Sequence, residues 1–191
     1  VYSSNSTGTW SLVRTVSNSP NAAVSIVVNG ESSPFVSDPS ISPDGKKIVF
    51  GTFIRGVWHL GMTNLDGSGL MTLLGEGHDP TFSPDGKRIA FVRMVNGRAQ
   101  IFTVDPETGS KVVQVTSGDN DNVEPSWSPD GQFILFASNR AANKPGKGYV
   151  AQERAERRGR FNLFALRPDG TTLVQLTDGE ANSGAPVWGQ D

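Results

Sequence analysis

The sequence predicts an all-β domain made of four copies of one unit, in which each unit is a blade of four short antiparallel strands in a β-propeller. Two observations predict this fold. The tetrapeptide Ser-Pro-Asp-Gly occurs at 42–45, 83–86 and 128–131, and this spacing of roughly 40 residues is typical of propeller blades. The chain of 191 residues is also rich in turn formers, with 22 Gly and 12 Pro.

Each Ser-Pro-Asp-Gly is expected to be the turn of a β-hairpin. Proline fixes φ at the first central position, aspartate accepts hydrogen bonds from nearby backbone, and glycine adopts positive φ without a steric clash. An apolar run follows each copy, at 48–50, 89–91 and 134–136, and a proline precedes each copy at 39, 80 and 125. Paired strands around a short turn give this pattern.

The remaining strands of each unit also repeat. Third strands are expected at 57–60, 99–102 and 161–164, and fourth strands at 73–74, 113–116 and 173–177. A glycine-containing turn separates the third from the fourth strand in every copy. Four antiparallel strands in such a unit make one blade, which predicts blades at 37–76, 78–118 and 122–179.

The repeated motif resembles that of the TolB-like β-propeller family. Residues 80–91 read Pro-Thr-Phe-Ser-Pro-Asp-Gly-Lys-Arg-Ile-Ala-Phe, and the aromatic position holds Trp127 in the third copy and Ile41 in the first. Three good copies cover residues 38–178. The resemblance implies a propeller that binds other proteins through its loops and its channel face. The motif itself is structural and identifies no activity.

The two ends of the chain resemble complementary parts of one further blade. Residues 186–191 align with the first strand of the unit, and residues 1–30 align with the other three strands. We therefore expect a first blade made of 1–30 plus 185–191, in which N- and C-terminal strands close a four-bladed ring. Two alternatives stay open: a segment of a larger propeller, for which the family usually uses six blades, and assembly of two chains into one eight-bladed ring through the split blade.

An acidic residue precedes the first proline in three of the four copies, at Asp38, Asp79 and Glu124, whereas the fourth has Ala185. Because the first strand of a blade lines the channel, these carboxylates are expected near one channel mouth. One interpretation is a metal site for a hard cation such as Ca²⁺, the one cofactor considered, or a site for a basic partner group. The other is that each carboxylate accepts hydrogen bonds from local backbone at a turn.

Residues 141–160 interrupt the last blade between its second and third strands. The segment carries Lys144, Lys147, Arg154, Arg157, Arg158 and Arg160 but only two glutamates. These cations, together with Tyr149, predict a contact arm for an acidic partner, because long insertions on rigid scaffolds are frequently functional. The alternative is a solvated loop.

Composition and motifs exclude several kinds of chemistry. The chain has no cysteine and two histidines, so disulfides, thiolate catalysis and multi-histidine metal sites are excluded. The net charge of −2 does not indicate a nucleic-acid partner, and no apolar run is long enough for a membrane span. Known catalytic signatures such as Gly-x-Ser-x-Gly and His-Glu-x-x-His are absent from the sequence.

These observations favour a non-enzymatic protein-interaction module that binds a protein partner through channel-face loops or the insertion. Two alternatives are a carbohydrate-binding or cell-surface propeller, and a glycan-active enzyme that uses the channel-mouth carboxylates. The resemblance, with a first residue that is not methionine, suggests a periplasmic or extracellular location.

Overall fold

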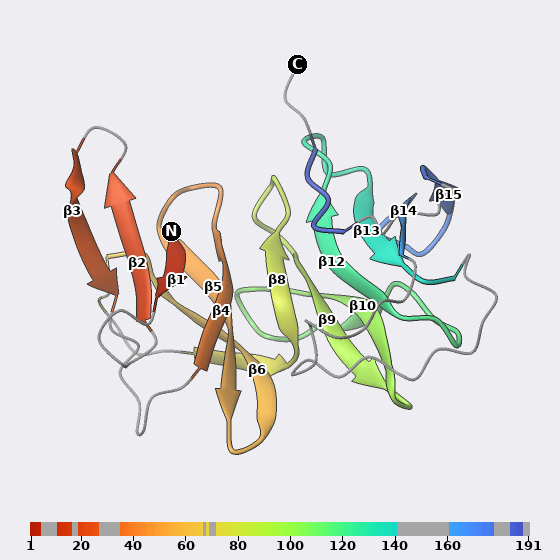
Figure 1. Ribbon diagram of the computed structural model, residues 1–191, viewed down its shortest axis with the longest axis horizontal. Coiled ribbons are helices and arrows are strands. Elements are labelled where there is room, and N and C mark those ends of the chain that lie inside the picture. The colour runs from red at the N-terminus through yellow and green to blue at the C-terminus, as the bar shows by residue number, and fades with distance from the viewer. Residues whose placement is uncertain are drawn as a thin grey trace.

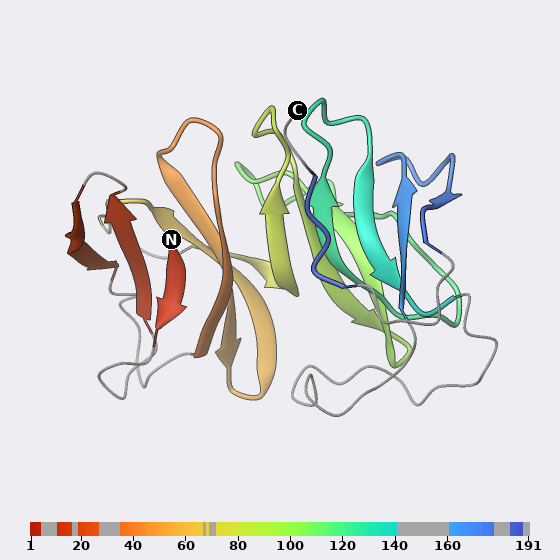
Figure 2. The same cartoon turned by 45° about the horizontal axis from the view of Figure 1, so that its top comes forward.

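The computed structural model describes residues 1–4, 11–16, 19–26, 35–66, 68, 72–140, 161–177 and 184–188, and for 11–16 and 19–26 it describes the side chains of Leu12 and Val13 alone. Within these ranges every regular element is a β-strand, and the strands form four antiparallel sheets that follow one another in chain order (Figure 1). The same row of sheets is seen in the turned view (Figure 2). The described part of the chain holds no helix with the length and apolarity that crossing a membrane requires.

Each sheet is a meander in which consecutive strands pair. The first holds β1 (Tyr2–Ser4), β2 (Ser11–Val16) and β3 (Ser19–Ile26). The second holds β4 (Phe35–Ile41), β5 (Lys47–Ile54), β6 (Val57–Asn64) and β7 (Thr72–Glu76). The third holds β8 (His78–Phe82), β9 (Ile89–Val95), β10 (Arg98–Val104) and β11 (Val113–Gln114). The fourth holds β12 (Asn122–Trp127), β13 (Ile134–Ser138), β14 (Asn162–Leu166) and β15 (Val174–Gln175).

The Ser-Pro-Asp-Gly segments are the hairpin turns that the sequence predicts. In the second copy, Ser83 Oγ donates to Asp85 Oδ1 at 2.6 Å, and the same oxygen of Asp85 accepts from the amide of Lys87 at 3.1 Å. Gly86 has a φ of 70° and its amide donates to the carbonyl of Ser83. The first and third copies form the same hydroxyl-to-carboxylate and amide-to-carboxylate bonds.

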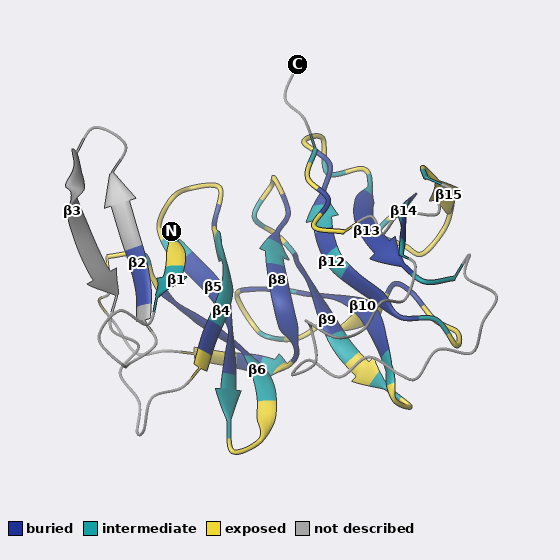
Figure 3. Ribbon diagram, viewed as in Figure 1, coloured by how far each residue is buried: buried dark blue, intermediate teal, exposed yellow. Residues whose placement is uncertain are grey.

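The core lies between sheets. One buried cluster joins Val49 and Leu60 of the second sheet to Phe91 and Phe102 of the third. A second cluster joins Ile101 of the third sheet to apolar residues of the fourth. Figure 3 shows that buried residues lie along the strands that face a neighbouring sheet. Face-to-face packing of meanders around a shared inner edge is the architecture of a propeller.

The expected closure of the ring is not seen in the described residues. The sheet of β1–β3 has three strands there, and residues 184–188 lie beside β12, across the row of sheets from β1–β3 (Figure 1). Trp188 Nε1 donates to the carbonyl of Ser126 at 3.4 Å, which repeats the 3.2 Å bond from Trp127 Nε1 to the carbonyl of Thr81. The segment therefore lies where the inner strand of a next blade is expected.

Candidate functional site

The inner strands β4, β8 and β12 lie side by side and carry the three predicted acidic positions (Figure 1). Asp38, Asp79 and Glu124 have φ values of 49°, 50° and 56°, and each falls where the strand shifts register against its partner. Aspartate tolerates positive φ better than most residues, and the following proline has no amide for the ladder. An acidic residue before proline therefore marks a β-bulge here.

At two of these bulges the contacts of the acidic side chain are defined. Asp79 Oδ1 lies 3.3 Å from His78 Nδ1, and both side chains are buried. Glu124 Oε2 accepts a hydrogen bond from the amide of Ala185, which has a φ of 48° at the corresponding position of the next segment. Glu124 thus links two successive inner segments through a backbone donor that lies 61 positions further along the chain.

The described residues contain no group of three or more His, Asp or Glu side chains arranged to hold a metal ion. Asp38, Asp79 and Glu124 are all among those residues. The structure therefore gives no support to a calcium site built from the three carboxylates. Each of the three lies on the bulge of its own inner strand, and a cation site shared between them stays a prediction.

The base of the insertion is a network of hydrogen-bonded polar side chains. Residues 141–160, including Lys144, Lys147, Tyr149, Arg154, Arg157, Arg158 and Arg160, lie outside the described residues. Arg140, directly before them, donates from its guanidinium to Asn122 Oδ1 at 2.8 Å and to Ser138 Oγ at 3.2 Å. Its guanidinium carbon also lies 5.1 Å from the ring centroid of Phe164. Burial lowers the pKa of the Arg140 guanidinium from its ordinary value.

Asn139 and Asp121 extend this network to the loop before β12. Asp121 Oδ2 accepts from Asn139 Nδ2 at 3.1 Å and lies 3.4 Å from Arg98 Nη1, and Asp121 Oδ1 accepts from the amide of Ala99 at 3.1 Å. The Asp121 amide in turn donates to Asn139 Oδ1. Buried polar networks of this kind are rigid when every group is paired. Asn139 and Arg140, the two residues directly before the insertion, are therefore held in place.

The side chain of Gln100 extends the same hydrogen-bond network to the residues that precede β12. Its Oε1 accepts from Thr116 Oγ1 and Asn122 Nδ2, both at 2.9 Å, and its Nε2 donates to the carbonyls of Gly118 and Asn120. Sequence reasoning missed these residues. The available signal was a polar residue at the same place in two otherwise apolar third strands, Gln100 and Asn162, with a threonine after each fourth strand.

A family model described as the TolB beta propeller domain matches residues 15–145. The chain belongs to this family of β-propeller repeat proteins. No curated protein matches the chain in sequence.

Solved structures show the same fold. The putative TolB of Agrobacterium tumefaciens matches at a TM-score of 0.64 and 22% identity over 87% of this chain and 60% of that one. TolB of Acinetobacter baumannii matches at a TM-score of 0.69 and 20% identity over 93% of this chain and 40% of that one. An oligogalacturonate lyase in complex with manganese matches at a TM-score of 0.62 and 16% identity over 91% of this chain and 49% of that one. The chain thus spans 60% or less of the length of these proteins.

Proposed function

We propose that the chain is a non-catalytic protein-interaction domain that binds its partner through the basic insertion at 141–160 and the neighbouring channel-face loops. One observation carries the proposal: the insertion departs from Arg140, whose guanidinium is fixed by Asn122, Ser138 and Phe164. A rigid base under a cationic segment lowers the ordering cost of binding an acidic surface. Membership of the TolB beta propeller domain family supports a protein-interaction role in general.

Cross-linked capture from an envelope extract of the source organism tests this proposal. The wild-type chain is compared with a variant in which the six Lys and Arg residues of 141–160 are replaced by Gln. A matched control replaces exposed cations outside the insertion, Lys46, Lys87 and Lys111, by Gln. We expect one protein to be captured by the wild type and the control and lost from the insertion variant. Identical capture by all three chains would contradict the proposal.

We also propose a periplasmic or extracellular location, which the relation to TolB proteins supports. Fractionation of cells that express the native gene with a C-terminal tag measures it. Recovery with a cytoplasmic marker would contradict it.

A second candidate, a glycan-active enzyme, is favoured by the likeness to the oligogalacturonate lyase over 91% of this chain. In that case the acidic residues at the bulges, Asp79 foremost, are the candidate groups. Incubation with oligogalacturonate, with and without manganese, decides between the two. Our leading proposal expects no unsaturated product. Turnover by the wild-type chain that is lost in Asp79→Asn would favour the enzyme over the protein-interaction domain.

We further propose that residues 184–188 act as the inner strand of the β1–β3 sheet on ring closure, within one chain or between two. The three-stranded state of that sheet in the described residues and the inner-strand position of 184–188 support this. Solution mass with X-ray scattering tests it. A compact monomer of 20.4 kDa supports a four-bladed ring and a compact dimer supports an eight-bladed ring. An extended monomer contradicts closure.

A further inference from the structure

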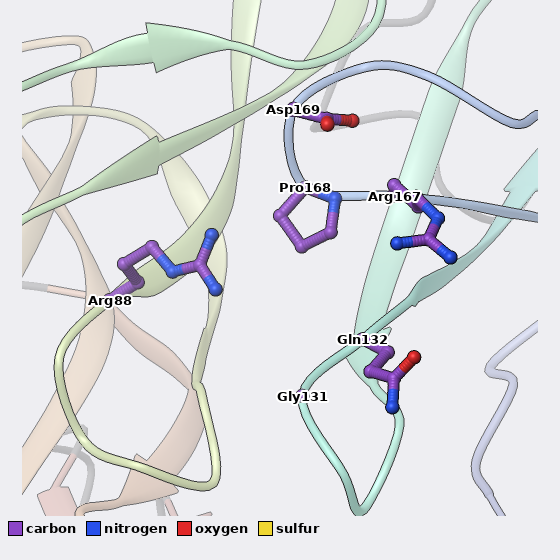
Figure 4. A pocket seen from close by; sticks show the side chains of 6 residues that line it. All are labelled: Arg88, Gly131, Gln132, Arg167, Pro168 and Asp169. Carbon is purple, nitrogen blue, oxygen red and sulfur yellow. The ribbon is translucent and has the colours of Figure 1, made fainter.

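The hollow at the boundary between the third and fourth sheets has its charges matched within the chain. Its volume is about 230 Å³, and Arg88 of the third sheet lies across it from Arg167 and Asp169 of the fourth (Figure 4). The hydroxyl and the amide of Thr171, followed by the charge of Arg167, lower the pKa of Asp169. Carboxylates also line the adjoining hollow beside Arg88. An unmatched feature lies instead at the end of the row of sheets, and it is apolar.

At each internal boundary, an apolar side chain at or directly after the outer strand packs on the next sheet. Leu74 is 8% exposed in the cluster between the second and third sheets, and Val115 is 7% exposed in the cluster between the third and fourth. The amide of Val115 donates to the carbonyl of Ile101 at 2.8 Å. Leu176 occupies the corresponding place of the fourth sheet, where its amide donates to the carbonyl of Leu163 at 2.8 Å. Leu176, however, is 51% exposed.

The third strands show the same change. Leu60 and Ile101 are fully buried in the two clusters, whereas Leu163 at the corresponding place is half-buried. We call Leu163 and Leu176 the outer face of the fourth sheet. Residues 184–188 lie beside this sheet in the position of the inner strand of a next blade. Among the described residues, no second or third strand of such a blade is joined to that segment.

The β1–β3 sheet carries a complementary exposed position. Alignment of residues 1–30 with the repeated unit places Tyr2 where Phe91 and Phe136 stand in later units. Phe91 and Phe136 are buried in the clusters with the preceding sheet, whereas Tyr2 is 49% exposed. Val1 packs in the cluster shared with the second sheet. Because successive side chains of a strand alternate between its two faces, Tyr2 points away from the second sheet. Tyr2 thus marks the outer face of the β1–β3 sheet.

The two outer faces lie far apart within one chain. The four sheets form one row, with β1–β3 and the fourth sheet at its opposite ends (Figures 1 and 2). Buried clusters fill the boundaries between neighbouring sheets, and close-packed interiors resist rearrangement. The faces of one chain can therefore meet only if these clusters repack. The corresponding face of a second copy can reach the fourth sheet without that change.

We propose that the outer face of the fourth sheet binds the β1–β3 sheet of a second copy of this chain, with Tyr2 of that copy packed on Leu163 and Leu176. Residues 184–188 of the first copy then lie beside β1 of the second as the inner strand of a shared blade. The contact is head-to-tail and repeats the packing of the two internal boundaries. The inference rests on the proposed ring closure and assigns that closure to a contact between two chains.

Sedimentation equilibrium of the 191-residue chain over a range of concentrations tests the proposal. We expect a mass above 20.4 kDa that rises with concentration. Leu176→Glu and Tyr2→Glu should each weaken self-association by about tenfold or more, because each places a charge in an apolar contact. Val113→Glu is the matched control, since Val113 is 48% exposed but belongs to the third sheet. This control should associate as the wild type does.

A mixture of the two variants distinguishes contact between copies from contact within one chain. The Leu176→Glu chain keeps an intact β1–β3 face, and the Tyr2→Glu chain keeps an intact face on the fourth sheet. We therefore expect the equimolar mixture to form a dimer at concentrations where each variant alone is monomeric. A contact within one chain could not be restored by mixing. Unchanged circular dichroism spectra show that the variants are folded.

Three results would overturn the inference: a wild-type mass of 20.4 kDa at every concentration, a mixture that stays monomeric, or a loss of association in Val113→Glu equal to that in Leu176→Glu. If the wild-type monomer is compact by X-ray scattering, ring closure within one chain still stands. An extended monomer contradicts both. The capture experiment on the insertion is independent of all three results.

Discussion

The indole Nε1 of Trp127 donates to the carbonyl of Thr81 at 3.2 Å, across the boundary between β12 and β8. Trp188 makes the corresponding bond to Ser126 one repeat later. A tryptophan at this position of the motif therefore links β12 to β8 and residues 184–188 to β12. At the boundary between β8 and β12, the ring of Trp127 also packs against the guanidinium of Arg88.

Replacement of Trp127 should weaken that boundary. Trp127→Phe keeps an aromatic ring and loses the hydrogen bond, with an expected loss of about 1 kcal/mol of unfolding free energy. Trp127→Ala should lose about 3–5 kcal/mol because the side chain is 6% exposed. Urea denaturation measures both. Ile41→Ala is the control at the same motif position, where the side chain is 41% exposed. A loss at Ile41 as large as that at Trp127 would contradict the role of the indole.

Gly77, between β7 and β8, should not tolerate a side chain. Its φ is 152°, and an added Cβ would lie 2.5 Å from Phe91 Cδ2 and 2.9 Å from the carbonyl oxygen of Val92. Gly77→Ala should lose about 3 kcal/mol or more, because backbone strain adds to overpacking. Gly97→Ala is the control, since Gly97 also has positive φ but no atom within 4 Å of its added Cβ. We expect about 1–2 kcal/mol for the control. Thermal denaturation measures both losses. A loss for Gly77→Ala no larger than that for Gly97→Ala would contradict the prediction, because the added methyl group would then not be overpacked against Phe91.

Gln100→Leu should destabilise the base of the insertion. The substitution keeps the approximate volume but leaves Asn122 Nδ2 and the carbonyls of Gly118 and Asn120 without this partner. We expect a loss of about 2 kcal/mol or more, with faster hydrogen exchange in the loop before β12. Gln114→Leu is the control, because Gln114 is exposed and its side chain donates to the carbonyl of Thr116. Unchanged exchange in Gln100→Leu would contradict the role of the network.

Ser83→Ala should raise the pKa of Asp85. The hydroxyl of Ser83 is the main reason that this pKa lies below its ordinary value of 3.8, with smaller contributions from the Lys87 amide and from nearby Arg88 and Lys87. A carboxylate with a lowered folded pKa stabilises the fold above the unfolded value, and this stability is lost as pH falls through the folded pKa. The variant should therefore be destabilised more at neutral pH than in acid below 3.8.

Carboxyl carbon shifts against pH measure the pKa of Asp85, and denaturation at the two pH values measures the stability. Ser110→Ala is the control, because the Ser110 hydroxyl contacts Thr108 and not a carboxylate. An unchanged pKa for Asp85 in Ser83→Ala would refute the assignment.

The sequence was most informative where one local motif decides the structure. Ser83, Asp85 and Gly86 lie within four residues, so their turn could be predicted without knowledge of the rest of the chain. The family relation could be predicted for the same reason, and the family model confirms it.

The candidate sites were less predictable because they depend on contacts between repeats. Asp79 and Glu124 were expected near one channel mouth, and what the sequence did not reveal is that both are bulge residues that contact His78 and the amide of Ala185 respectively. The hydrogen bond that Asn122 Nδ2 donates to Gln100 Oε1 joins residues of adjacent sheets, and no local sequence motif predicts it.

The buried clusters each span a single boundary between neighbouring sheets, and this has a consequence for how the chain can change. Stability in such an array approximates a sum of unit terms and nearest-neighbour interface terms, as in a one-dimensional lattice. A duplication or deletion of one whole unit then alters the number of terms without altering the form of any interface. Blade number is therefore an evolvable quantity in this fold, whereas the buried apolar contact between neighbouring sheets is the constraint that every added unit must satisfy.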